Sequence, residues 1–185
     1  MEPTILTTAR NPMFEQIIKF LNEEDTAWKI EQAYEQRGGW EGWLQVELAI
    51  HLKRVFEHDL FPGCTVKVTR EDYIYGESSK RSDILLKTMV DGKTFYNALE
   101  LKCETYLGGK SFRQKVKEDC EKIDDADLGG AYRPCTAWVV AFSVTKDLSS
   151  LRVDDRNLEV YPGKIKVGDL PIKMYWGRKD FNKKE

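Results

Sequence analysis

Several kinds of chemistry are missing from this 185-residue sequence. It has only two histidines and four cysteines, and the cysteines lie far apart without a CxxC pair. Neither a zinc site nor a dense disulfide framework is therefore expected, and a reducing compartment is favoured. The HExxH, GxSxG and complete GxxxxGK[ST] motifs are absent, which argues against a zinc protease, a serine hydrolase and a P-loop nucleotide-binding protein.

Long apolar runs are also missing. No stretch is long enough to span a bilayer, and residues 1–4 lack the basic and apolar regions that begin a secretory signal. We therefore expect a cytoplasmic protein with no membrane partner, while delivery into another cell stays open. With 41% apolar and 32% charged residues, the length suits one domain, residues 1–185, with its own core.

The net charge gives little sign of a nucleic-acid partner, since it is only −2 at pH 7. The distribution of charge is more informative. Acids outnumber bases in residues 1–60, whereas bases outnumber acids in residues 80–118. A positive region in the middle of the chain suits a nucleic-acid-binding surface, and an ordinary mixed surface is the alternative.

The periodicity of apolar residues predicts an α/β fold. The expected helices cover residues 12–21, 26–36, 40–58 and 111–127, and the expected strands cover residues 65–69, 84–89, 95–105 and 137–144. Asp91-Gly92 predicts a hairpin turn, so the sheet should begin as an antiparallel meander. The 111–127 helix should then lead into a central strand by a strand–helix–strand crossover. Residues 157–177 are typical of a further hairpin, and residues 178–184 are expected to fray.

Charges within two short apolar stretches are the most informative feature. Asp83 lies near the start of one predicted strand, and Glu100 and Lys102 alternate with leucines on the next. Buried charges are costly unless they are paired or bind a metal. Two carboxylates supply hard oxygen ligands for magnesium, and a lysine on the same face can approach an attacking water. The pattern therefore predicts a hydrolytic magnesium site.

Asp83 followed by Glu100-x-Lys102 resembles the motif of the PD-(D/E)xK nuclease superfamily, and Ser82 stands at the position of the motif's proline. The resemblance implies hydrolysis of phosphodiester bonds with Mg²⁺ or Mn²⁺ as cofactor, with DNA expected ahead of RNA. It also implies that Asp83, Glu100 and the Leu101 carbonyl bind the metal. Lys102 would orient or deprotonate the attacking water.

The same resemblance implies a restriction-endonuclease-like core, in which a mixed central sheet is flanked by helices. It covers about residues 40–145 of the chain. Residues 1–39 would add N-terminal helices as a cover, and residues 146–185 would add a β extension with the C-terminal hairpin.

A further acid, Glu47, stands among apolar residues of the expected 40–58 helix. Many members of the superfamily have a glutamate on the helix before the first core strand. The resemblance therefore implies that Glu47 is a catalytic residue that acts on the metal through a bound water. Pairing with a buried arginine or with His51 is the structural alternative.

The 111–127 helix has its charges in an unusual order. Bases gather in its first turns and acids in its later turns, opposite to the preference of the helix dipole. Phosphate binding at the N-terminal end would explain this order. We therefore expect nucleic acid to contact Lys110 and Arg113. In the superfamily the helix after the motif's lysine often presents a polar residue to the site, so the resemblance implies that Gln114 and Lys115 also contact nucleic acid. The C-terminal hairpin is the alternative surface.

A metal-dependent nuclease is the favoured function, and three alternatives stay open. The first is a toxin-type nuclease domain that a cognate inhibitor protein neutralises. The second is an inactive member of the superfamily that binds nucleic acid or protein. The third is a non-enzymatic interaction domain in which the D…ExK spacing arises by chance. The sequence gives no indication of oligomeric state.

Overall fold

Three helices, a three-stranded meander, a fourth helix and a C-terminal set of strands follow one another along the chain in the computed structural model. The structure describes residues 12–37, 39–60, 64–76 and 80–182. The helices are α1 (Pro12–Leu21), α2 (Glu24–Tyr34), α3 (Glu41–Val55) and α4 (Gly109–Asp124). The longer strands are β1 (Thr65–Asp72), β2 (Ser82–Val90), β3 (Lys93–Cys103), β4 (Cys135–Ser143) and β8 (Lys173–Phe181). Short strands are β5 (Arg152–Val153), β6 (Arg156–Asn157) and β7 (Glu159–Val160).

A mixed six-stranded sheet forms the middle layer, with strand order β1-β2-β3-β4-β8-β7. Strands β1, β2 and β3 pair antiparallel, and both residues of the Asp91-Gly92 turn have positive φ angles, as such hairpin turns require. Strands β3 and β4 are parallel, so they need the crossover that α4 provides. The predicted meander and the strand–helix–strand crossover are therefore both confirmed.

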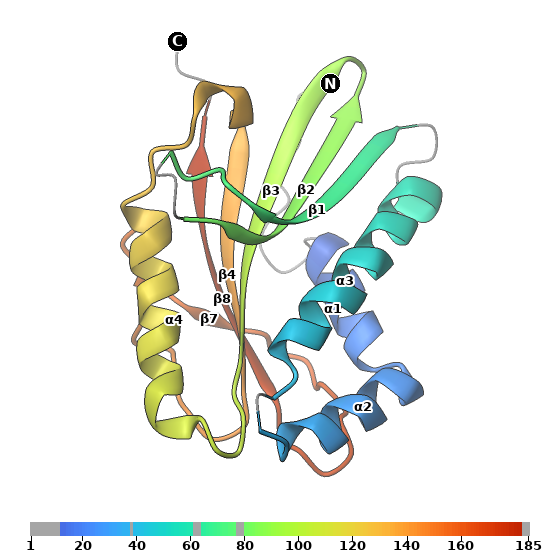
Figure 1. Ribbon diagram of the computed structural model, residues 1–185, viewed down its shortest axis with the longest axis vertical. Coiled ribbons are helices and arrows are strands. Elements are labelled where there is room, and N and C mark those ends of the chain that lie inside the picture. Colours follow the sequence, from blue (N-terminus) through green and yellow to red (C-terminus); the bar gives the residue numbers. More distant parts are fainter. Residues whose placement is uncertain (1–11, 38, 61–63, 77–79, 183–185) are drawn as a thin grey trace.

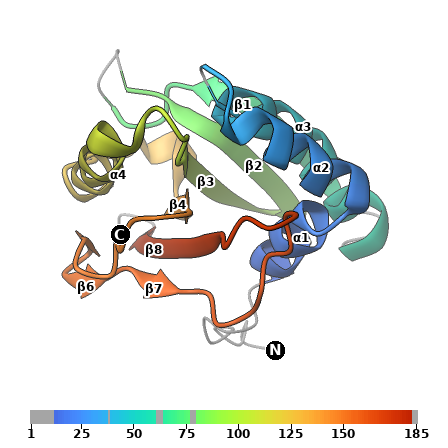
Figure 2. The ribbon, with the colours of Figure 1, turned by 90° about the horizontal axis from the view of Figure 1, so that it is seen from below.

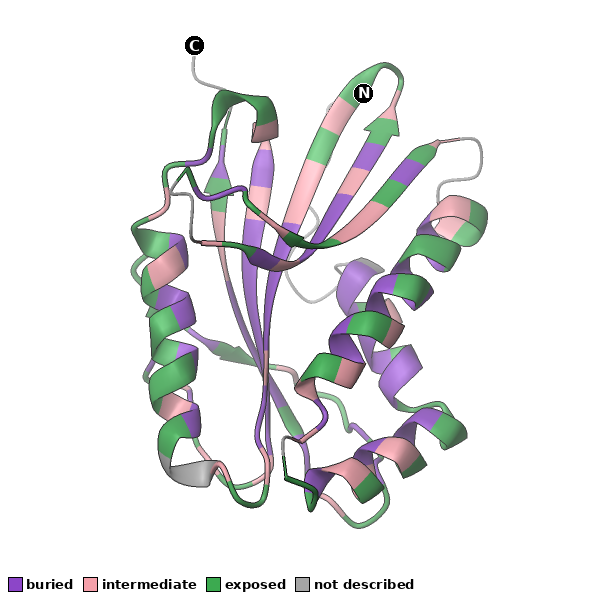
Figure 3. Ribbon diagram, in the orientation of Figure 1, coloured by how far each residue is buried: buried purple, intermediate pink, exposed green. Residues whose placement is uncertain are grey.

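Helices cover both faces of the sheet, with α4 on one face and α1, α2 and α3 on the other (Figures 1 and 2). The side of each helix toward the sheet is buried, and the outer side is exposed (Figure 3). The core under α4 includes the face predicted for that helix, which consists of Phe112, Val116, Cys120 and Ile123. The opposite core includes Trp40, Trp138 and Trp176. The α/β arrangement is thus confirmed.

Helix α3 differs from the prediction in its length and its burial. It ends at Val55 and continues as a π-helical turn, Phe56–Leu60, instead of running regularly to residue 58. Apolar residues cover most of the circumference of this helix, which predicts a helix buried on most sides. That prediction is wrong, because Val46 and Ile50 are 38% and 61% exposed. Only part of the helix surface packs on the sheet and on neighbouring helices, so apolar side chains remain in water on the outer side.

The C-terminal region joins the sheet more deeply than predicted. Strand β8 pairs with β4 from residue 173 to residue 181, so the prediction that residues from 178 onward fray is wrong for 178–181. The hairpin expected within residues 157–177 would pair residues 158–161 with a strand at Lys164–Val167. That strand is absent among the described residues, where only a Val167–Leu170 bridge occurs, and β7 pairs antiparallel with β8 instead. Neighbouring glycines and prolines interrupt strand pairing in this segment.

Two expectations about the whole chain can also be compared with the structure. All four cysteines are free thiols, and three of them are buried. This agrees with the expected lack of disulfides. In the described ranges, no helix is both long enough and apolar enough to cross a membrane.

Glu104, just after β3, connects the end of β3 to the end of the parallel strand β4 through hydrogen bonds. It is 2% exposed, and its carboxylate accepts hydrogen bonds from Ser143 Oγ at 2.7 Å and from the backbone N–H groups of Val144 and Thr145 at 2.7 and 2.8 Å. Burial by itself would raise the pKa of Glu104, but the hydrogen bonds outweigh burial and hold that pKa below its ordinary value. The charged form of Glu104 therefore stabilises the fold.

We expect Glu104→Gln to lower the free energy of unfolding by about 2 kcal/mol at pH 7. The NH₂ group of glutamine would replace one carboxylate oxygen and would face groups that are themselves hydrogen-bond donors. Since the folded-state pKa is depressed, this contribution is present above the ordinary glutamate pKa of about 4.3 and disappears as the pH falls through the lower folded-state value. Urea unfolding at several pH values measures the difference. Glu159→Gln, on the exposed strand β7, is the control. An equal effect of both variants would contradict the prediction.

Candidate active site

Asp83 is held at the point where β2 and β3 separate. The backbone pairing of these strands ends at Ile84 and Leu99. Beyond that point the N–H of Leu101 donates a hydrogen bond to Asp83 Oδ2 at 2.7 Å. A buried backbone donor needs a partner, and here a carboxylate takes the place of the neighbouring strand. Asp83 is therefore fixed beside β3.

Glu100 is completely buried. Its Oε1 accepts a hydrogen bond from Tyr75 Oη at 2.5 Å, and its Oε2 forms an ion pair with Lys122 of α4. The pKa of Glu100 is raised to about 8, mainly by burial. The positive charge of Lys122 opposes this rise, and the charges of Asp119 and Asp83 add to it. Burial and nearby carboxylates thus outweigh the single cation paired with Glu100.

Lys102 lies among carboxylates from three elements. Its Nζ is 3.1 Å from Asp119 Oδ2, 3.3 Å from Glu41 Oε1 and 3.9 Å from Asp83 Oδ2. It also donates a hydrogen bond to the Leu101 carbonyl at 3.0 Å. Burial lowers the pKa of Lys102, but the charges of Asp119, Glu41 and Asp83 outweigh burial and raise it. Lys102 is therefore a permanent cation in this arrangement.

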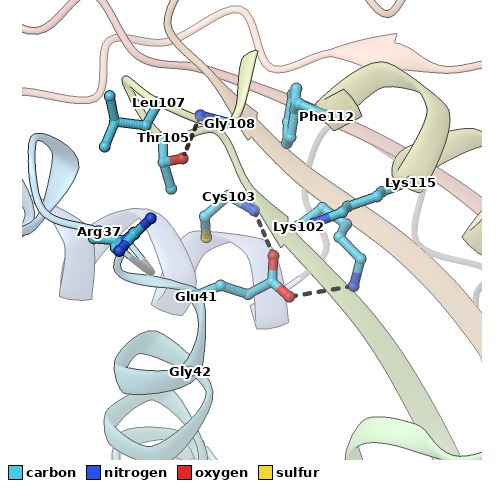
Figure 4. A pocket seen from close by; sticks show the side chains of 10 residues that line it. All are labelled: Arg37, Glu41, Gly42, Lys102, Cys103, Thr105, Leu107, Gly108, Phe112 and Lys115. Atoms are coloured by element: carbon cyan, nitrogen blue, oxygen red, sulfur yellow. Dashed lines mark hydrogen bonds and ion pairs between the residues drawn. The ribbon is translucent and has the colours of Figure 1, made fainter. Parts of the chain in front are cut away.

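Sequence reasoning missed Glu41, which comes from the first turn of α3. Its Oε1 approaches Lys102, and its Oε2 accepts a hydrogen bond from the N–H of Cys103 at 3.1 Å (Figure 4). An acid in the first turn of a helix is common because it favours the helix dipole. Nothing in the sequence therefore distinguished Glu41 from an ordinary surface residue.

The acid and the lysine on the core side of α4 were also missed. Asp119 is 8% exposed, and its Oδ2 accepts no hydrogen bond although it is ion-paired with Lys102. Lys122, one turn further along, is 3.5 Å from Asp119 Oδ1 and donates a hydrogen bond to the carbonyl of Arg81. Burial raises the pKa of Asp119 despite the two lysines. The helical spacing from Val116 to Asp119 was the available signal, since it places an acid on the core face.

The structure does not place Glu47 in this cluster. Glu47 is half-buried, and its charge acts on Lys29 of α2, whose pKa it helps to raise. Six residues along a helix turn a side chain by roughly 240°, so Glu41 and Glu47 leave α3 in different directions. The carboxylate of α3 that contacts Lys102 is therefore Glu41.

The four residues expected to contact nucleic acid have different surroundings. Arg113 donates hydrogen bonds to the Asp147 carbonyl and to Ser150 Oγ, both at 2.6 Å, so its guanidinium is already engaged within the protein. Gln114 donates to Glu118 on the outer side of α4. Lys115 lines a cavity that also contains Lys102. The side chain of Lys110 lies outside the described part of the structure.

The carboxylates fit a hard divalent cation in chemistry and charge. Asp83, Glu100, Asp119 and Glu41 present oxygen atoms that can coordinate a metal, and among the described residues Asp119 Oδ2 has only the ammonium of Lys102 beside it at 3.1 Å. Only two lysines offset the four carboxylates. Within the described ranges, however, no group of three or more His, Cys, Asp or Glu side chains is arranged to hold a metal ion. Lys102 and Lys122 occupy the positions between the acids.

Comparison with known proteins gave no match. No family model, no curated protein and no solved structure matches this chain. The site is therefore interpreted from its own geometry.

A double-mutant cycle can test the contact between Glu41 and Lys102. We expect Lys102→Met and Glu41→Gln to be coupled by about 1 kcal/mol in the free energy of unfolding, because the charges are close and partly buried. Lys102→Met and Glu47→Gln should be additive within about 0.3 kcal/mol, as distant residues are. Urea unfolding of the single and double variants gives both values. Stronger coupling to Glu47 than to Glu41 would refute the assignment.

Proposed function

We propose that this chain is a metal-dependent nuclease that hydrolyses phosphodiester bonds, with DNA as the expected substrate ahead of RNA. The observation that carries the proposal is the meeting of Asp83, Glu100 and Lys102 in one nearly buried cluster. Asp83 Oδ2 lies 3.9 Å from Lys102 Nζ, and the charge of Asp83 raises the pKa of Glu100. Perturbed ionisable groups of this kind concentrate at catalytic sites.

The order of the elements also supports the proposal. A helix, an antiparallel three-stranded meander, a second helix and a parallel fourth strand follow one another from α3 to β4. The cluster lies on the two adjacent strands β2 and β3 of that meander. This is the placement that the resemblance to a restriction-endonuclease-like core implies, and α3 and α4 add one acid each to the site.

Mg²⁺ or Mn²⁺ would be held by Asp83 and Glu100, with Asp119 as a further acid. Bound there, the ion would act as a Lewis acid that activates a water, and its positive charge would offset negative charge on the phosphate. The Leu101 carbonyl, a further proposed ligand, accepts a hydrogen bond from Lys102. In the ion-paired arrangement Lys122 holds Glu100, so binding requires this lysine to release one carboxylate oxygen.

The protein's own residues would divide the remaining work. Lys102 is held protonated by its carboxylates, so it suits stabilisation of the extra negative charge on phosphorus in the transition state. Glu41 lines the cavity beside Lys102, and burial raises its pKa. A carboxylate with a raised pKa is a better proton acceptor. Glu41 is thus the proposed base for the attacking water.

An inactive relative that binds nucleic acid or protein is the second candidate. It is favoured by the fact that both oxygens of Glu100 already have partners, Tyr75 and Lys122. Such a closed set of ion pairs can persist in a fold without any metal. The toxin-type alternative and its inhibitor protein stay predictions from the sequence.

Activity assays test the first candidate. Purified protein with Mg²⁺ or Mn²⁺ should degrade DNA, and EDTA should abolish cleavage. Lys102→Met should lower kcat by about 100-fold or more, because a positioned charge is lost from the transition state. Lys53→Met, which removes an exposed lysine of α3, should leave kcat unchanged. Folded protein that cleaves no DNA or RNA with either metal would favour the inactive candidate.

Isothermal titration calorimetry with Mn²⁺ tests the metal ligands separately. Asp83→Asn and Glu100→Gln should each weaken Mn²⁺ binding by at least about 10-fold, since each removes an anionic oxygen ligand. Lys53→Met should bind Mn²⁺ like the unmodified chain. Unchanged affinity in both ligand variants would show that the ion binds elsewhere.

A further inference from the structure

A cationic cavity opens beside the buried cluster, between the start of α3, the end of β3 and the start of α4 (Figure 4). Its volume is about 540 Å³, and it is lined by Arg37 and Lys115 in addition to Lys102 and Glu41. Arg37 and Lys115 are exposed. Within the described ranges neither of them has a hydrogen bond or ion pair to another side chain. Their charges are therefore available to an anion that enters the cavity.

A second cavity of about 540 Å³ adjoins the first, and both are lined by Leu107 and Gly108. Its wall contains Tyr34 and Tyr106, whose rings meet edge to face with centroids 6.3 Å apart. Tyr106 is 70% exposed and Leu107 is 68% exposed. The backbone N–H of Tyr106 donates to the Tyr34 carbonyl at 3.1 Å, so the exposed ring is carried by an anchored segment.

Together the two cavities offer the two contacts that an unpaired nucleic-acid strand needs. Proteins bind single strands by pairing a positive groove for the backbone with aromatic rings on which bases stack. Here Lys115 and Arg37 line the cationic cavity, and Tyr106 lies beyond Leu107 in the aromatic one. A strand with a phosphate in the first cavity would continue past the shared Leu107 and Gly108 into the second.

The depth of the site argues against an intact duplex. The side chains of Lys102 and Asp83 are only 16% and 15% exposed, and Glu100 is not exposed at all. Enzymes with recessed sites act on single strands or extrude a nucleotide from the helix.

We infer that the substrate is a single, unpaired polynucleotide strand, bound with a phosphate in the cationic cavity and a base against Tyr106. This inference rests on the proposed nuclease function and narrows its substrate class. Single-stranded DNA and RNA share the recognised chemistry, namely a phosphodiester backbone with accessible base faces.

Cleavage is compared on labelled substrates of one sequence in Mn²⁺: single-stranded DNA, single-stranded RNA, blunt duplex DNA, and a duplex with a single-stranded overhang. At least one single strand should be cut about 10-fold or more faster than the blunt duplex. On the overhang substrate, products should map to the unpaired segment and stop near the junction. The faster-cut single strand shows whether the enzyme prefers deoxyribose or ribose, and such a preference for either single strand over the blunt duplex supports the inference.

Binding is measured in EDTA by fluorescence anisotropy, so that it does not depend on turnover. Lys115→Ala should weaken single-strand binding and reduce the slope of log affinity against log salt by about 0.7, the value for one lost phosphate contact. Lys117→Ala is the matched control, because Lys117 is on the outer side of α4 and pairs with Glu121. Tyr106→Ala should weaken binding by about 10-fold, whereas Tyr106→Phe keeps the stacking ring and should restore it.

The outcomes separate this inference from the proposed function. Equal cleavage of blunt duplex and single strands would overturn the inference and leave the nuclease function intact. Single-strand binding that depends on Lys115 and Tyr106, without cleavage in any metal, would support the inference and refute the nuclease function. Unchanged single-strand binding in Lys115→Ala and Tyr106→Ala would overturn the inference whether or not cleavage occurs.

Discussion

The burial of Lys102 among carboxylates is the constraint on which the site depends. A lysine in this position loses most of its hydration, and only nearby anions compensate for that loss. Asp83, Glu41 and Asp119 supply the compensation from β2, α3 and α4, all within 4 Å of its Nζ. The separation of β2 from β3, the start of α3 and the crossover helix must therefore all be in place for the cluster to form.

Paired buried charges affect the free energy of unfolding differently when the cluster is complete and when one partner is missing. A complete buried cluster adds little net stability, whereas removal of one partner is expensive because it leaves an uncompensated charge. The raised pKa values of Glu100, Asp119 and Glu41 show that the carboxylates are only partly compensated. A fold with such a cluster is less stable than one with well-packed apolar residues in the same place. Clusters that lower stability in this way are most often found at functional sites. The same excess of negative charge is what a divalent cation would offset.

Much of the fold could be predicted because its signals are local. Alternating or 3.6-residue apolar periods located the four α-helices and strands β1 to β4 within a few residues, and Asp91-Gly92 identified the hairpin. The strand pairing of residues 178–181 could not be predicted in this way. Their pairing with β4 is a contact between distant segments, and the charged residues of this stretch are equally typical of a frayed end.

The sequence by itself determined that a polar cluster lies inside an α/β core, since it places acids and a lysine within leucine-rich strands at Asp83, Glu100 and Lys102. Only the tertiary structure decided which other residues complete it. Glu41 and Asp119 reach Lys102, and Glu47 does not, because the orientation of α3 and α4 on the sheet determines where each carboxylate points. Likewise, Arg113 and Lys115 are close in sequence, yet one is bound to the 147–150 loop and the other faces the cavity. Helix direction, packing and the path of distant loops determine these differences, and none of them leaves a local pattern in the sequence.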